Sequence, residues 1–194
     1  KIIRGLEFHT GSKEEKLPYA ASNFPYIASQ AELDYYREPF VPWHWHKAIE
    51  LFFIESGQLT YCTPNKTMIF PAGSAGMVNS NVLHMTKFQA GKEKNIQLLH
   101  IFDPQLIGGS CGSLMEEKYV MPIITASWLE IIGLYPDNPI QAGIIDLIYQ
   151  TFQLSEDEFG YEINIREALS RIWIQLLKLL SPNLQETTQL ANGL

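Results

Sequence analysis

The feature that most restricts the fold is a series of short apolar runs between residues 41 and 103. Each run is rich in β-branched and aromatic residues, and glycine, proline or asparagine residues lie between the runs. The runs that this pattern predicts as strands are 49–54, 58–63, 67–70, 75–79, 85–88 and 96–102. Because strands spaced about 8–12 residues apart are typical of sandwiches and barrels, we predict a mostly β domain.

Composition supports one globular domain that does not bind nucleic acid. Hydrophobic residues make up 46% of the 194 residues, which excludes a disordered chain, a collagen and a disulfide scaffold. The formal net charge of −7 argues against nucleic-acid binding by this chain, because phosphate binding needs a basic surface. No run approaches the roughly 18 apolar residues of a membrane span. With only Cys62 and Cys111, we predict a cytoplasmic protein with reduced thiols and no membrane partner.

The chain divides into four predicted segments. Residues 1–40 contain a polar loop and scattered prolines, which indicates an N-terminal arm with a few short strands. Residues 41–136 are predicted to form the barrel, although the pattern becomes ambiguous after Pro104. Residues 137–182 are predicted to be helical, and the polar tail 183–194 is predicted to be a linker.

Two helices are expected in the helical segment. The first is predicted from Pro139 to about residue 154, because Asn138 is suited to cap a helix and proline to begin one. The second is predicted over about 161–180, with Ser181-Pro182-Asn183 ending it.

The second predicted helix carries an apolar seam. Its members recur at the spacing of a helix that packs on another surface, and they are Ile165, Leu169, Ile172, Trp173, Leu176 and Leu179. Two interpretations stay open for this seam. Either it covers one face of the barrel, or it pairs with its copy in a homodimer.

Four polar side chains form the candidate site. His44 and His46 point to the same side of an extended segment, because alternate residues of a strand share a face. Glu50 has the same parity, and Gly57 completes the pattern H-x-H-x3-E-x6-G. A second pattern, Gly73-x5-Asn79-x-Asn81-x2-His84, follows later in the barrel segment.

The first pattern resembles the first motif of the cupin superfamily, and the second resembles its second motif, G-x5-P-x-G-x2-H. Asn79 replaces the proline and Asn81 the glycine, and asparagine still tolerates a positive φ in a turn. The resemblance implies a cupin-type double-stranded β-helix, a jelly-roll barrel, which the predicted two-helix dimerisation segment would follow. It also implies metal ligation by His44, His46, Glu50 and His84.

The ligand set itself suits a divalent transition metal such as Fe, Mn, Ni, Co, Cu or Zn better than Ca or Mg. An alternative stays open at this stage. The same histidines and carboxylate also suit a metal-free pocket for a sugar or a small acid.

A narrower resemblance covers most of the chain. Residues 42–57, 78–84, 101–104 and 161–173 resemble the sensor domain of arabinose-regulator (AraC/XylS) transcription factors. That family implies a cupin domain that binds a small effector, often a sugar, and dimerises through C-terminal helices. It also implies a linker that leads to a helix-turn-helix DNA-binding domain. No residues after Leu180 resemble such a domain. DNA would therefore be contacted only through a domain absent from this chain.

The expected function is effector sensing rather than catalysis. The residues predicted to bind the effector are His44, His46, Glu50, His84, Trp45, Tyr61 and Arg37. Trp45 would stack on a sugar ring, with a structural role as its alternative, and Arg37 is either a clamp from the arm or a surface residue. The rival hypothesis is a metal-dependent cupin enzyme, a dioxygenase or an isomerase.

Overall fold

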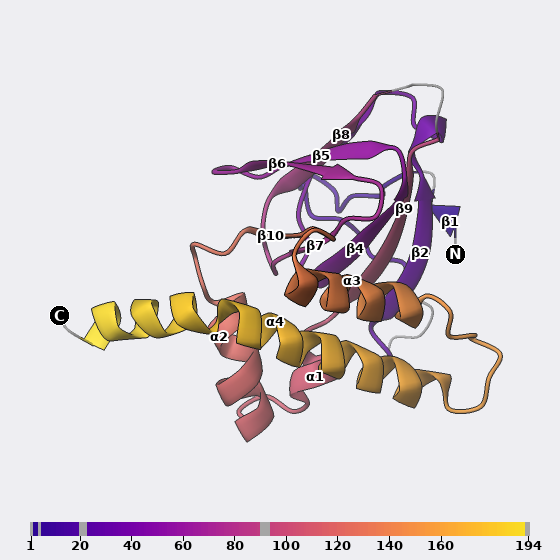
Figure 1. The fold of residues 1–194 in the computed structure, drawn as a ribbon. Helices are drawn as coiled ribbons and strands as arrows, with labels where there is room; N and C mark the ends of the chain where they lie inside the picture. The colour runs from indigo at the N-terminus through magenta and orange to yellow at the C-terminus, as the bar shows by residue number, and fades with distance from the viewer. Residues whose placement is uncertain (1, 4, 20–22, 90–93, 193–194) are drawn as a thin grey trace.

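The structure is a computed structural model that describes residues 2–3, 5–19, 23–89 and 94–192. Its strands form two facing sheets (Figure 1). The six-stranded sheet has the order β1 (Ile2–Ile3), β2 (Tyr26–Glu32), β9 (Ile96–Phe102), β4 (Ile49–Ser56), β7 (Ala75–Val78) and β10 (Ile131–Leu134). The four-stranded sheet has the order β3 (Phe40–His44), β8 (His84–Phe88), β5 (Gln58–Cys62) and β6 (Thr67–Pro71).

All neighbouring strands are antiparallel except β1 and β2, which are parallel. Each run predicted as a strand forms one, with ends that differ by at most two residues. The predicted mostly β fold, a cupin-type jelly roll followed by C-terminal helices, is confirmed.

The central strands are apolar along their whole length because both faces of the six-stranded sheet are covered. On β4, Phe52 points into the space between the sheets, whereas Leu51 points to the outer face, and both are fully buried. Phe102 of β9 likewise packs on the outer side. The sequence of a strand buried on both faces is a continuous run of apolar residues rather than an alternation of apolar and polar residues.

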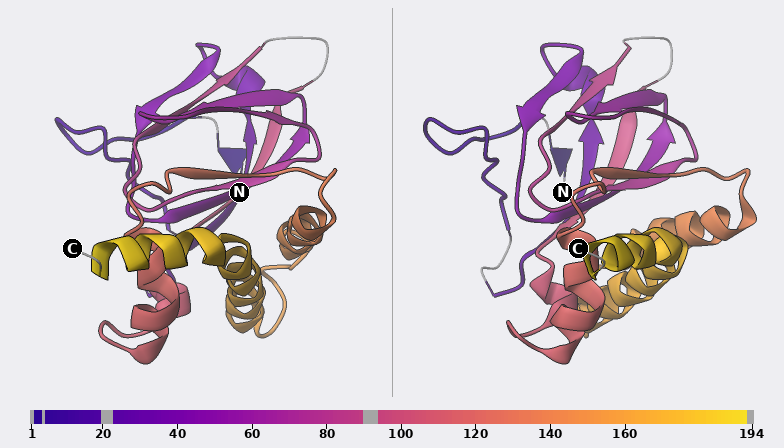
Figure 2. Two further views of the ribbon diagram at one scale, coloured as in Figure 1. Left: turned by 60° about the vertical axis from the view of Figure 1, so that its left-hand side comes forward. Right: turned by 90° about the vertical axis from the view of Figure 1, so that its left-hand side faces the viewer.

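Helices cover the outer face of the six-stranded sheet. α3 (Pro139–Thr151) and α4 (Tyr161–Asn192) run side by side beneath it (Figures 1 and 2). Asn138 caps α3 as predicted, since its side chain accepts hydrogen bonds from the amides of Ile140 and Gln141. The ambiguous segment after Pro104 contains α1 (Gln105–Gly108), a π-helical turn (Glu116–Val120) and α2 (Met121–Ile124).

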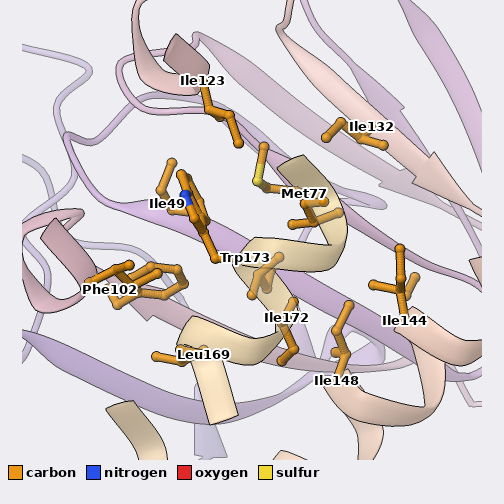
Figure 3. Packing of buried hydrophobic residues seen from close by; sticks show 14 of the residues in the cluster. Ile49, Met77, Phe102, Ile123, Ile132, Ile144, Ile148, Leu169, Ile172 and Trp173 are labelled. Atoms are coloured by element: carbon orange, nitrogen blue, oxygen red, sulfur yellow. The ribbon is translucent and has the colours of Figure 1, made fainter. Parts of the chain in front are cut away.

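The apolar seam of α4 packs inside this chain. Figure 3 shows Leu169, Ile172 and Trp173 directed toward the sheet and α3. Of the residues predicted for dimerisation, Ile165, Leu169, Ile172, Trp173 and Leu176 are at most 1% exposed, and Leu179 is half-buried against the same core. The seam therefore covers the barrel within one chain, and its use as a contact between subunits stays a prediction.

The predicted end of the second helix at residue 180 is wrong, because α4 continues through Pro182 to Asn192. A proline inside a helix leaves the carbonyl four residues earlier without its amide donor. Here the Ser181 hydroxyl donates a 2.9 Å hydrogen bond to that Lys178 carbonyl. One turn beyond Leu180, Leu184 packs against the core, which favours continuation. The segment predicted as a linker therefore begins as helix.

None of the helices in the described ranges is long and apolar enough to cross a membrane.

The N-terminal arm is shorter than predicted. β2 pairs with β9 along all of Tyr26–Glu32, so this part of residues 1–40 belongs to the barrel sheet. Within the arm, a bridge between Phe8 and Glu15 closes a small hairpin, and a second bridge joins Glu14 to Trp45. The arm therefore lies against the segment that contains His44 and His46.

Candidate metal and ligand site in the barrel

The structure brings the four motif residues together. His44 ends β3 and is paired in register with His84, the first residue of β8. His46 lies just beyond β3, and Glu50 is the second residue of β4. All four are buried, and one ligating atom from each lies within 4.8 Å of the others. Parity relates only His44 to His46, because a bend at residues 47–48 takes the chain into the six-stranded sheet, where Glu50 lies on β4. The pairing of β3 with β8 adds His84.

Backbone carbonyls orient the three imidazoles. Each Nδ1 lies within hydrogen-bond distance of a carbonyl oxygen, namely His44 to Pro42 (2.7 Å), His46 to Ala48 (2.9 Å) and His84 to Val82 (2.9 Å). A carbonyl only accepts, so Nδ1 carries the proton and Nε2 keeps its lone pair. The Nε2 atoms of His46 and His84 are buried and have no hydrogen-bond partner among the described residues.

The Glu50 carboxylate is held in a fixed orientation. Tyr61 donates a 2.7 Å hydrogen bond to Glu50 Oε1, and Gln97 Nε2 in turn donates to the Tyr61 hydroxyl. Glu50 Oε2 is thereby left for the imidazoles, and it lies 3.6 Å from Nε2 of both His46 and His84. Two ligands bound about 2.1 Å from one ion lie roughly 3–4 Å apart, so these separations fit a shared cation.

The electrostatics of the site are dominated by burial and by the Glu50 charge. Burial opposes ionisation of Glu50, but His46 and His84 outweigh it and hold the Glu50 pKa well below its usual value. Burial also disfavours a charged His46, yet the neighbouring Glu50 carboxylate raises the His46 pKa. Burial, together with the nearby His84, lowers the pKa of His44 to about 3.

Sequence reasoning missed Glu15, which the arm delivers to the same cavity. Its carboxylate Oε2 lies 3.9 Å from His44 Nε2, and its side chain is buried. Burial is the main cause that raises the pKa of Glu15 to about 7. Glu15 stands in a polar stretch with charged neighbours, which is typical of a surface loop. Only the backbone pairing of the arm with Trp45 reveals its position, and no local sequence signal predicts that pairing.

The cavity between the sheets is small. Its volume is about 40 Å³, and its polar lining comes from Glu15, His44, Glu50, Tyr61, His84, Thr86 and Gln97. The remaining walls are Leu6, Ala31, Leu33, Tyr36, Val41, Leu99 and Ile101. A water molecule occupies about 30 Å³ in the liquid, and pockets for organic ligands measure about 300–1,000 Å³. The cavity therefore has room for an ion with a water molecule but not for a sugar ring.

Three of the predicted effector residues, His46, Trp45 and Arg37, do not line this cavity. Trp45 has the opposite parity to His44 and His46 and is half-buried, and its backbone N–H donates to the Lys13 carbonyl of the arm. Arg37 lies exposed after the 3₁₀ turn at Leu33–Tyr35. Tyr61, by contrast, is buried in the cavity wall and stacks on Phe52 with ring centroids 4.3 Å apart.

The two asparagines that depart from the cupin pattern have structural roles. Asn81 has a φ of 60°, which confirms the left-handed turn expected of a residue that replaces glycine. The Asn79 side chain donates to the Ile123 and Leu129 carbonyls, at 2.9 and 3.0 Å. A proline at residue 79 would make neither of these bonds, so the substitution ties the barrel to the segment around α2.

Comparisons with known proteins support the fold. No protein-family model matches the chain, and no curated protein matches it by sequence. A crystal structure of apo ToxT from Vibrio cholerae matches with a TM-score of 0.50 and 10% identity, over 81% of this chain. The match covers 57% of the ToxT chain, so this chain corresponds to little more than half of that protein.

Shorter cupin structures match parts of the chain as well. A cupin-2 domain protein from Shewanella frigidimarina has 22% identity and a TM-score of 0.33, over 41% of this chain and 72% of its own. A cupin superfamily protein from Desulfitobacterium hafniense has 16% identity and a TM-score of 0.30, over 33% of this chain and 56% of its own.

Proposed function

We propose that this chain is the ligand-sensing domain of a transcription regulator of the arabinose-regulator type, and that a divalent transition-metal ion is its ligand. The observation that carries the proposal is the convergence of three buried imidazoles and one buried carboxylate, of which His44, Glu50 and His84 line a cavity of about 40 Å³. The likeness to ToxT, a regulator of the AraC family, extends over both the barrel and the helices and supports the regulator part.

The donor set favours a metal ion over an organic ligand. Buried polar atoms without partners cost free energy, and a cation would satisfy the lone pairs of His46 Nε2 and His84 Nε2 at once. Imidazole nitrogens with one carboxylate suit Fe, Mn, Ni, Co, Cu or Zn. The carbonyl partners of the Nδ1 atoms are the kind of outer-shell support that ligating histidines usually have.

A sugar or a small acid remains the alternative effector. Such a ligand would have to displace the arm, because Leu6 and Glu15 line the cavity. The homodimer and the contact with DNA through another domain also remain predictions. Because the α4 seam is buried inside this chain, a dimer through the seam would first have to expose these residues.

One strand links the site to the helices. β4 presents Glu50 to the cavity, and three residues later Phe53 contacts Tyr149 of α3, with ring centroids 5.1 Å apart. A ligand that favours one position of β4 would therefore shift the population of helix arrangements. We propose that this shift is the signal passed toward the DNA-binding part of the regulator.

Metal titration tests the proposal. The protein is stripped with a chelator, and binding of Mn, Fe(II), Co, Ni and Zn is measured by calorimetry and elemental analysis. We expect one ion per chain, with His84→Ala weakening the affinity by at least about 100-fold and Tyr61→Phe by about 10–100-fold. His9→Ala is the matched control, because His9 is exposed, and it should leave the affinity unchanged. Absence of stoichiometric binding would overturn the metal proposal.

The sensing part is tested separately by hydrogen exchange. Metal binding should change the exchange rates of α3 amides as well as those around the site. Changes confined to the site would contradict signal transmission to the helices. The alternative of an organic effector is tested by thermal-shift measurements with a panel of sugars and small acids. A raised melting temperature of the metal-free protein with one of these compounds would favour an organic effector.

The same cluster makes a metal-dependent enzyme, a dioxygenase or an isomerase, the second candidate. The metal-loaded chain is incubated with the same panel while oxygen uptake and isomer formation are followed. Turnover that disappears in Glu50→Gln would replace the sensor proposal with the enzyme.

A further inference from the structure

We propose that Glu15 of the N-terminal arm is an additional residue of the metal site, so that a bound divalent ion holds the arm against the barrel. This inference rests on the proposed metal function. It concerns a residue outside both motifs, contributed by a segment that does not belong to either sheet. Metal occupancy and arm docking would then be one coupled equilibrium.

The position of Glu15 is set by the arm backbone rather than by its side chain. Its N–H donates a 2.9 Å hydrogen bond to the Trp45 carbonyl, and the Trp45 N–H donates to Lys13 at 3.1 Å. Trp45 stands between His44 and His46, so the arm pairs with the segment that carries two of the candidate ligands. The bridge to Phe8 closes the hairpin behind Glu15.

The side chain of Glu15 lines the same cavity as His44, Glu50 and His84. It is 7% exposed, and its Oε2 lies 3.9 Å from His44 Nε2. That separation is longer than a hydrogen bond, yet it is within the roughly 3–4 Å expected between two ligands of one ion. Glu50 and His84 line the same cavity, and the group whose ligand atoms all lie within 4.8 Å of one another contains only the four motif residues, so Glu15 would approach the ion from the side of His44.

Glu15 would supply the negative charge that the four motif residues lack for a divalent ion. A divalent ion held by three neutral imidazoles and Glu50 would leave one uncompensated positive charge in a buried cavity. The Glu15 carboxylate brings the total charge of the site to zero. Because an unpaired buried charge costs free energy, a bound ion would raise the equilibrium constant for docking of the arm. By linkage, docking of the arm would raise the affinity for the ion by the same factor.

The test compares Glu15→Gln with Glu7→Gln in the full chain. Glutamine keeps the size of Glu15 and its backbone hydrogen bonds but removes the charge, and Glu7 is exposed on the same hairpin. Mn, Co and Zn affinities are measured by calorimetry. Hydrogen exchange of the Glu15 and Trp45 amides, with and without metal, measures arm docking independently.

For the unmodified chain and Glu7→Gln, we expect metal to slow exchange of both amides by at least about tenfold. For Glu15→Gln, we expect at least about tenfold weaker metal binding and loss of that protection. If Glu15→Gln does not fold, Glu15→Asp keeps the charge with a shorter side chain and should give intermediate values of both quantities.

The two proposals fail in different ways. Equal metal affinity in Glu15→Gln and the unmodified chain, with arm exchange insensitive to metal, would overturn the role of Glu15 and leave the metal site standing. Failure of the unmodified chain to bind any of the metals would overturn the proposed function and this inference together.

Discussion

Replacing Trp173 tests whether the α4 seam packs inside one chain. Trp173 is 1% exposed, its ring lies edge-on to Phe102, and its Nε1 donates a 2.8 Å hydrogen bond to the Tyr119 carbonyl. A buried indole of about 200 Å² at about 25 cal/mol per Å² corresponds to about 5 kcal/mol. Aromatic-to-alanine changes in cores cost about 3–5 kcal/mol. We expect Trp173→Ala to lower the free energy of unfolding by about 4–5 kcal/mol.

Urea and thermal unfolding followed by circular dichroism measure this loss. For a chain of this length, about 2–4 °C per kcal/mol gives a Tm lower by roughly 8–20 °C. Ile174→Ala is the matched control, because Ile174 is the next residue and 50% exposed, and its effect should stay within about 0.5 kcal/mol. If the alanine variant does not fold, Trp173→Phe keeps a ring but loses the hydrogen bond, at a cost of about 1–2 kcal/mol.

The oligomeric state decides between the two interpretations of the seam. Intramolecular packing predicts that the loss of stability is the same at all protein concentrations. If Trp173→Ala instead converted a dimer into monomers of nearly unchanged stability, as measured by sedimentation, our assignment of the seam to the core of one chain would be refuted.

Two further predictions concern buried polar groups. Asn79→Ala leaves the Ile123 and Leu129 carbonyls without their donor, so we expect about 2–4 kcal/mol lower unfolding free energy in urea. A loss below about 1 kcal/mol would contradict that role. Burial lowers the pKa of His100 from 6.5 to about 3, so the unfolded chain binds a proton that the folded chain excludes between those values. This stabilising contribution is complete above pH 6.5 and decreases as the pH falls toward 3, by about 2 kcal/mol at pH 5. His100→Gln should remove this part of the pH dependence of urea unfolding, and identical slopes in both proteins would contradict it.

The barrel was predictable because its signals are local. Turn residues separate apolar runs of strand length, and the structure places a strand at each run. The α3 cap was equally predictable, since Asn138 and Pro139 act on the adjacent turn. The end of α4 was not, because proline usually ends a helix. The Ser181 hydroxyl and the tertiary contact of Leu184 offset that preference, and the latter depends on distant parts of the chain.

The candidate site was predictable only in part. Strand parity relates His44 to His46, whereas Glu50 reaches them from β4 of the other sheet and the pairing of β3 with β8 adds His84. Glu15 was not predictable, because its burial depends on where the arm lies and not on its neighbours in sequence. The cavity volume likewise depends on side chains from several elements, so the expectation of a sugar-sized pocket could not be checked before the fold was known.

Periodicity and turn residues along the chain were enough to establish the class of fold, the strands and the shared side of His44 and His46, because side chains two apart on a strand share a face in any sheet. The tertiary structure decided which apolar surfaces face each other. It assigned the α4 seam to the barrel rather than to a second subunit, since an apolar stripe is the same in sequence whichever partner buries it. It also decided that an arm carboxylate enters the cavity, because contacts between segments far apart in sequence leave no periodic trace.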